Sequence, residues 1–275
     1  MAELHQRPQS EGWCSSQMLV DYHVHTTFSD GKSDLTNYVR EAEKKRLDEI
    51  GFSDHIHFKK ESWSMSFVDL PIYVHRITSL KASSRVSVKI GLEVDFIPSE
   101  IDGLMQVING FDFDYLIGSV HHLGDWLIDT ERQIDKWKWK DVDEVYQQYY
   151  TVVQSMVKTG LFDIVGHLDL AKKFGFRPKG DLTDVLSETV GAISKKHMCV
   201  EANTSGLRRP CHEIYPSEKL LEMCFNHGVP VTMGSDAHMP EHVASDFGQA
   251  RTLLRKVGYT QIVSFNERKL ELKSL

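Results

Sequence analysis

The sequence has few cysteines and no pattern that would join them. Cys14, Cys199, Cys211 and Cys224 are the only four in 275 residues, and none belongs to a Cys-x-x-Cys motif. This spacing excludes a regular disulfide framework. It indicates reduced thiols, and we therefore expect a cytoplasmic protein.

Long apolar runs and an excess of basic residues are missing too. No run approaches the roughly 20 residues that cross a membrane, and the polar residues 1–17 lack the apolar segment of a signal peptide. The formal net charge of −7 leaves no broad basic surface for nucleic acid. We expect neither a membrane nor a nucleic acid as partner.

We expect a loose N-terminal extension over 1–17 and a single domain over 18–275.

Histidine, in contrast, is abundant. The chain holds 14 histidines, several of them close to acidic residues at the ends of short apolar runs. His23 and His25 follow the apolar run 18–20, which is typical of a strand. Side chains two residues apart on a strand point to the same face, so this pair can approach one metal ion. The alternative is two surface histidines at a strand end.

Strand-like and helix-like segments alternate along the chain from residue 18. The strand-like segments are 18–23, 49–54, 86–94, 115–120, 162–166, 198–203 and 229–235, and the last two helices are expected near 246–257 and 266–274. Such alternation predicts parallel strands in an α/β fold. Polar candidates follow nearly every strand, which favours a closed seven-stranded barrel over an open sheet with one switch point.

One connection is unusually long. Residues 122–141 are polar and carry Trp126, Trp137 and Trp139. We expect this insertion to form a pocket wall or lid, or else a surface excursion packed by its own tryptophans.

Histidines and carboxylates recur where the strands end. The nine candidates are His23, His25, Asp30, His55, Glu93, His121, His167, Asp236 and His238. Any one of them could be a loop residue or a helix cap. Together they follow six of the seven predicted strands, whose carboxyl ends meet in a barrel. Imidazole and carboxylate ligands suit Zn, Mn, Fe or Co, so the sequence predicts a metal site at the C-terminal ends of the strands.

These residues also carry a family resemblance. The segments 23–25, 54–55, 166–167 and 234–238, together with Glu93, resemble the motifs of the polymerase-and-histidinol-phosphatase (PHP) superfamily. The motifs occur in order from about residue 19 to the end. The resemblance implies a distorted (β/α)7 TIM-like barrel with a trinuclear metal centre.

The resemblance also assigns ligands to three divalent ions. The implied sets are His23, His25, Glu93 and Asp236; then Glu93 as a bridge with His121 and His167; then Asp30, His55 and His238. The positive charge of three divalent cations exceeds the negative charge of three carboxylates, so this site is expected to attract a phosphomonoester dianion. The ions can activate water as the nucleophile, which makes Glu93 and Asp236 catalytic candidates.

Within the superfamily the chain resembles the stand-alone histidinol-phosphate phosphatases of histidine biosynthesis. The similar segments are 91–95, 118–121, 201–208, 213–216 and 235–242. This implies hydrolysis of L-histidinol phosphate to L-histidinol and phosphate. The alternatives are a phosphatase for a nucleotide, phosphotyrosine or another small phosphomonoester, and a non-catalytic metal-binding module. An amidohydrolase-like C–N hydrolase is disfavoured, because His121 stands where that class commonly has a lysine.

Residues beyond the ligands are harder to assign from sequence. We expect Arg177 and Arg208 to clamp phosphate oxygens, with Arg208 acting in catalysis, although both could be surface arginines. His242 is a further substrate contact that could, like His122, protonate the leaving group. Glu201 and Asn203 could orient ligands or fill the barrel interior. The sequence leaves the oligomeric state and the identity of the metals open.

Overall fold

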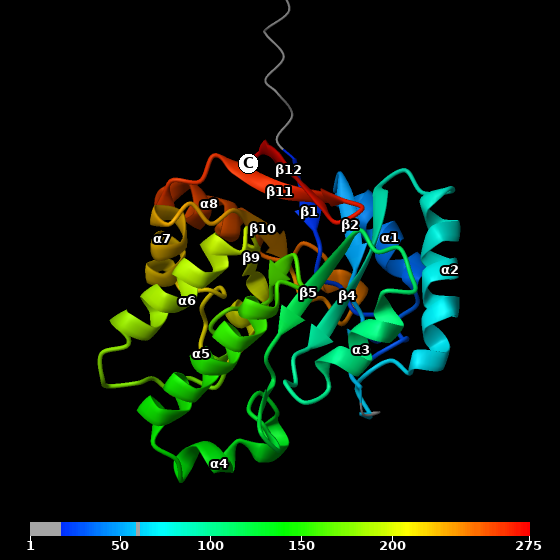
Figure 1. The fold of residues 1–275 in the computed structure, drawn as a ribbon. Helices are drawn as coiled ribbons and strands as arrows, with labels where there is room; N and C mark the ends of the chain where they lie inside the picture. Colours follow the sequence, from blue (N-terminus) through cyan, green and yellow to red (C-terminus); the bar gives the residue numbers. More distant parts are fainter. Residues whose placement is uncertain (1–17, 59–60) are drawn as a thin grey trace, which may run out of the picture.

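The computed structural model describes residues 18–58 and 61–275, and these form a nearly closed barrel of parallel strands (Figure 1). The neighbouring strands are, in order, β1 (Val20–Asp21), β2 (Glu49–Phe52), β4 (Ser87–Asp95), β5 (Tyr115–Ser119), β8 (Ile164–Val165), β9 (Cys199–Asn203) and β10 (Val231–Gly234). The short β3 (His55–Ile56) pairs with the end of β4. The predicted seven-stranded α/β barrel is confirmed.

The first and last strands of the barrel meet near their carboxyl ends. The Tyr22 N–H donates to the Met233 carbonyl over 3.1 Å, and the His25 N–H donates to the Ala237 carbonyl over 2.9 Å. Val24 and Ala237 form an isolated parallel bridge. Segments more than 200 residues apart in sequence therefore lie side by side at this end of the barrel.

Helices surround the strands and turn their apolar faces inward. They are α1 (Leu35–Lys44), α2 (Leu70–Lys81), α3 (Ile101–Ile108), α5 (Val142–Thr159), α6 (Thr183–Lys195), α7 (Glu218–Asn226) and α8 (Phe247–Val257). In α1, Leu35, Tyr38 and Val39 are buried at helical spacing. Short 3-10 helices lie between the larger elements: η1 (Phe67–Asp69), η3 (Leu170–Lys172), η4 (Thr204–Arg208) and η5 (Pro240–His242).

A hairpin covers the amino-terminal end of the barrel, at the end opposite α4 (Asp135–Lys138) in Figure 1. It consists of β11 (Gln261–Asn266) and β12 (Lys269–Ser274), so the helix predicted near 266–274 is wrong. Glu267 and Arg268 both have positive φ, 49° and 65°, which is the geometry of a tight hairpin turn. Phe265 packs on Tyr22 and Tyr115 at this amino-terminal end of the barrel, with ring centroids 6.0 and 6.1 Å away.

The 122–141 insertion is a small structured unit. It contains β6 (His122–Leu123), β7 (Trp126–Leu127), η2 (Glu131–Gln133) and α4 (Asp135–Lys138). Trp137 stacks on Phe176 with centroids 5.3 Å apart and contacts Trp126 at 5.0 Å. Its indole N–H donates to the Ile128 carbonyl over 2.9 Å, whereas Trp139 is 88% exposed. Two of the three tryptophans therefore fix the insertion against the barrel.

The buried apolar side chains form one continuous cluster that extends from Val20 to Leu275. The predicted extension over residues 1–17 lies outside the described residues, and the boundary of a single domain at residue 18 stays a prediction. Among the helices of the described chain, none is both long and apolar enough to cross a membrane.

Candidate metal centre

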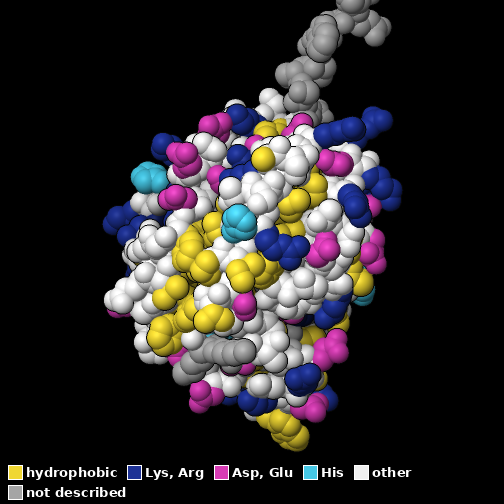
Figure 2. All heavy atoms as spheres, turned by 90° about the vertical axis from the view of Figure 1, so that its right-hand side faces the viewer, with side chains coloured by type: hydrophobic (Ala, Val, Ile, Leu, Met, Phe, Trp, Pro, Cys, Tyr) yellow, Lys and Arg dark blue, Asp and Glu magenta, His cyan; other side chains and the backbone are white. Residues whose placement is uncertain are grey.

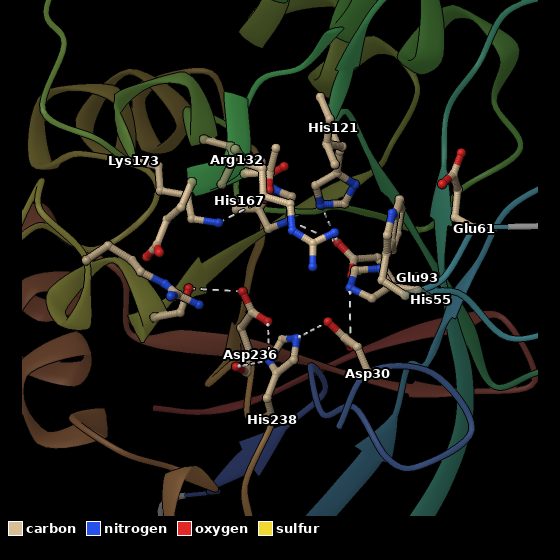
Figure 3. Close-up of a pocket in the computed structure, with 18 of the residues that line it drawn as sticks. Asp30, His55, Glu61, Glu93, His121, Arg132, His167, Lys173, Asp236 and His238 are labelled. Atoms are coloured by element: carbon tan, nitrogen blue, oxygen red, sulfur yellow. Dashed lines mark hydrogen bonds and ion pairs between the residues drawn. The ribbon is translucent and has the colours of Figure 1, made fainter. Parts of the chain in front are cut away.

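The structure brings all nine predicted ligands together at the carboxyl ends of the strands, seven of which are labelled in Figure 3. Their side chains form a network of imidazole–carboxylate contacts between 2.9 and 3.9 Å. His23, His25 and Asp30 follow β1, while His55 and Glu93 lie on β3 and β4. His121 follows β5, His167 follows β8, and Asp236 and His238 follow β10.

Glu93 stands at the centre of this network. Its Oε2 lies 3.1 Å from His23 Nε2 and 3.5 Å from His25 Nε2. Its Oε1 lies 2.9 Å from His167 Nε2 and 3.6 Å from His121 Nε2. The two carboxylate oxygens thus face different imidazoles, which is the arrangement expected of a carboxylate shared by two metal ions.

Asp30 organises a further group of ligands. Its carboxylate lies 3.1 Å from His238 Nε2 and 3.9 Å from His55 Nε2. The His25 ring is stacked against His55 and His238, with centroids 4.2 and 4.4 Å away. His55 Nδ1 also lies 2.9 Å from Glu93 Oε2, so this group is continuous with the Glu93 groups.

The buried atoms that face each other here fit divalent metal ions. His23 Nε2, His25 Nε2 and Glu93 Oε2 are buried without a hydrogen bond. Burial and the imidazoles of His55 and His238 lower the pKa of His25 to about 3. Burial alone would raise the pKa of Glu93, but the imidazoles of His55 and His23 hold that pKa well below its usual value. A neutral imidazole and an ionised carboxylate are the forms that bind metals.

Glu201 on β9 orients two of the ligands. Its Oε2 lies 2.8 Å from His23 Nδ1, and its Oε1 accepts the His167 backbone N–H over 2.7 Å. Asn203 donates its amide to the same carboxylate over 2.9 Å. A Cβ on Gly234 would lie 2.5 Å from Glu201 Oε2 and 2.7 Å from His23 Cβ, so any other residue there would displace this pair. Of the two sequence interpretations of Glu201, the geometry favours ligand orientation, because a carboxylate on the second imidazole nitrogen fixes the tautomer.

Asp95 supports the opposite side of the centre, and the sequence reasoning missed its role. Its Oδ1 lies 3.4 Å from His121 Nδ1, and its Oδ2 lies 2.7 Å from His122 Nδ1 and 3.7 Å from His57 Nε2. Asp95 lies two residues beyond Glu93 on β4 and so on the same face of the strand. That spacing was the signal that could have identified it.

The loop that carries Asp236 is held in a specific backbone conformation. Asp236 has φ 52°, which is uncommon for a residue other than glycine. Asp21 accepts the Ser235 N–H and hydroxyl at 2.9 and 2.6 Å. Arg208 donates to the Ser235 carbonyl over 2.6 Å and lies 3.6 Å from Asp246. Arg208 therefore fixes the residue that precedes the predicted ligand Asp236.

A cavity of about 610 Å³ opens over the predicted ligands. Among the described residues, the lysine and arginine side chains that line it are Arg132, Lys173 and Arg209. The insertion contributes Leu127 and residues 129–133 to its wall, as one sequence interpretation expected. Lys173 is paired with Asp129 over 2.9 Å.

The predicted substrate contacts Arg177, Arg208 and His242 are not among the described residues that line this cavity. Arg177 is paired with Glu213 over 2.8 Å at the surface. Both arginines thus have protein partners, and Arg209 occupies the cavity wall next in sequence to Arg208. Their roles, like those of the nine ligands, stay predictions.

Comparisons with known proteins agree with this geometry. The model of the PHP domain family matches residues 21–205. A probable histidinol-phosphatase of Deinococcus radiodurans is 32% identical over 259 residues, which cover 92% of this chain and 98% of that protein. The histidinol-phosphatase of Lactococcus lactis is 30% identical over 267 residues, covering 92% and 96%.

A solved structure shows the same likeness. The crystal structure of histidinol phosphate phosphatase from Lactococcus lactis, complexed with zinc, L-histidinol and phosphate, aligns with a TM-score of 0.80. The two chains are 27% identical in that alignment, which covers 93% of this chain and 100% of the other.

Proposed function

The chain belongs to the PHP domain family, and from this premise we propose that it is a metal-dependent phosphomonoesterase that converts L-histidinol phosphate and water to L-histidinol and phosphate. The observation that carries the proposal is the full-length likeness to a histidinol phosphate phosphatase whose crystal structure holds zinc, L-histidinol and phosphate. The reaction belongs to histidine biosynthesis.

Three groups of side chains would hold three divalent ions of Zn, Mn, Fe or Co. The groups are His23, His25, Glu93 and Asp236; Glu93, His121 and His167; and Asp30, His55 and His238. Such ions supply Lewis acidity and offset the charge of the phosphate. Both oxygens of Glu93 face imidazoles, so this residue joins the first two groups.

The remaining residues hold the site and bind the substrate. Glu201 and Asp95 orient ligand imidazoles, and Arg208 and Asp21 fix the loop before Asp236. Arg209 lines the cavity and makes no ion pair with any described residue, so it is available to a phosphate oxygen. The cavity volume lies in the range of small-molecule sites.

The protein is also proposed to act in the cytoplasm. Cys199, Cys211 and Cys224 are buried free thiols, which fits a reducing compartment. Cell fractionation tests this, and recovery of the protein in an oxidising compartment would contradict it.

The decisive experiment is a panel of phosphomonoesters. L-Histidinol phosphate, a nucleoside monophosphate and phosphotyrosine are assayed with protein loaded with Mn or Zn, and chelator-treated protein is the control. We expect kcat/KM for L-histidinol phosphate to exceed the others by on the order of a hundredfold. Preference for another ester would support the broader phosphatase alternative. Absence of turnover with every ester would overturn the proposal.

A further inference from the structure

The 122–141 insertion places a guanidinium without a protein partner in the described chain at the cavity over the predicted ligands. Arg132 lies in η2 and lines the same cavity as Glu93, His121 and His167. Figure 3 shows its side chain directed into the cavity, toward the middle of the labelled ligands. Its guanidinium has no hydrogen bond or ion pair within the described chain, in contrast to Arg177 and Arg208.

The backbone that carries Arg132 is tied to the metal centre from two sides. The Ile128 N–H donates to the carbonyl of the ligand His121 over 2.9 Å. Asp129 pairs with Lys173, which follows η3, over 2.9 Å. Together with the Trp137 stacking on Phe176, these contacts make the insertion a fixed wall. The backbone of Arg132 is therefore held beside the site, so a ligand that contacts the guanidinium has only the side chain to order.

Electrostatics indicates what Arg132 is placed to bind. Three divalent ions would bring six positive charges against the three carboxylates of Asp30, Glu93 and Asp236. The supporting carboxylates of Asp95 and Glu201 offset two more charges, so the cluster stays net positive. A guanidinium facing that cluster is repelled by it unless an anion lies between them. A phosphoryl group can bind the metal cluster and the guanidinium together, because some of its oxygens can face the cluster while another faces Arg132.

We propose that Arg132 is a phosphate-binding residue, which the insertion supplies for the phosphoryl group of the substrate and for the phosphate product. The proposal rests on the proposed phosphatase function. With Arg209 it places in one cavity two guanidiniums, from distant parts of the sequence, that make no ion pair with the described residues. The insertion is then part of the substrate site and more than a cover for the barrel.

Binding of inorganic phosphate to the zinc-loaded protein tests this without turnover. Titration calorimetry compares the wild type, Arg132→Ala and Lys138→Ala. Lys138 lies on α4 of the same insertion, pairs with Asp135 at the surface and does not line the cavity. We expect Arg132→Ala to weaken phosphate binding on the order of tenfold with unchanged zinc content, and Lys138→Ala to change it less than about twofold. Wild-type phosphate affinity in Arg132→Ala would overturn the proposal.

Turnover of two esters tests which part of the substrate Arg132 contacts. For L-histidinol phosphate and p-nitrophenyl phosphate alike, Arg132→Ala should lower kcat/KM by about ten- to a hundredfold, since the phosphoryl group is common to both. Arg132→Lys should recover part of the loss. A loss confined to L-histidinol phosphate would place Arg132 at the alcohol and contradict the assignment. If the wild type does not hydrolyse L-histidinol phosphate, the proposed function fails, while the phosphate titration still decides the role of Arg132.

Discussion

Glu93 is the residue on which most of the candidate centre depends. Its two oxygens face five imidazoles, those of His23, His25, His55, His121 and His167. Glu93→Gln replaces a charged ligand with a neutral amide in two metal groups at once. We expect this variant to lose more kcat and more bound metal than any other single ligand variant, as measured by steady-state kinetics and elemental analysis.

Asp30→Asn is the matched comparison for Glu93→Gln, because it also exchanges a carboxylate for an amide. Asp30 contacts only the third group, through His238 and His55. The Asn variant should therefore retain more turnover and more metal. If it lost more of both than Glu93→Gln, with circular dichroism showing both variants folded, the bridging role of Glu93 would be wrong.

Arg208 and Arg209 are adjacent in sequence but differ in environment. Arg208 donates to the Ser235 carbonyl beside Asp236, whereas Arg209 lines the cavity. Arg209→Ala should lower kcat/KM by about ten- to a hundredfold and leave the metal content unchanged, because it removes a charge-assisted contact with phosphate. Arg208→Ala should reduce metal affinity as well as turnover, because it releases the loop that carries Asp236.

Kinetics and metal analysis of the two arginine variants, measured together, separate these roles. Normal turnover in Arg209→Ala would remove that residue from the substrate site. Loss of turnover in Arg208→Ala with full metal occupancy would support the direct phosphate contact that the sequence alone suggested for Arg208.

Among the elements, the insertion allows a matched test because its tryptophans differ in burial. Trp137 is buried between Phe176 and Trp126, whereas Trp139 is 88% exposed. Trp137→Ala should lower the free energy of unfolding by about 3–5 kcal/mol and reduce turnover, because it loosens the wall that holds Arg132. Trp139→Ala should change stability by less than about 0.5 kcal/mol. Urea unfolding measures both, and equal effects would contradict the packing described for Trp137.

The elements also show where sequence reasoning succeeds and where it fails. Alternating strands and helices, with polar residues after each strand, were sufficient to predict the barrel and the convergence of residues such as His23 and His167. The hairpin at 261–274 was misassigned in part, because its Glu, Arg, Lys and Leu residues have high helix propensity. The alternation of Leu270 and Leu272 with charged residues is the period of a strand. Its position depends on Phe265 packing under Tyr22, a long-range contact that no local pattern specifies.

Side-chain partners were the other feature that the sequence could not supply. Nothing in the order Leu207-Arg208-Arg209 indicates which guanidinium turns to Ser235 and which turns to the cavity. Arg132 had no periodic signal at all, since the insertion lacks a regular apolar pattern. Such roles depend on contacts between elements, and only the folded chain defines them.

At the scale of the whole molecule, the candidate centre joins the two ends of the barrel sheet. His23 and His25 follow the first strand, Asp236 and His238 follow the last, and the strands meet by few hydrogen bonds. Metal ions bound between these ligands would hold the first and last strands together. The centre should therefore contribute to stability as well as to catalysis, because ligands that bind only the native state shift the unfolding equilibrium.

Metal removal tests this contribution directly. Protein purified without chelator should hold about three ions per chain by elemental analysis, because the nine candidate ligands form three groups. Chelation should lower the unfolding temperature by on the order of 5–10 °C, since an ion present at a hundred times its dissociation constant contributes about 2.7 kcal/mol. Adding Zn or Mn back should restore both the unfolding temperature and turnover. Glu93→Gln provides the control, because its unfolding temperature should respond much less to the chelator. One ion or fewer per chain after reconstitution, or an unfolding temperature that chelation leaves unchanged, would show that the barrel closes without a metal cluster.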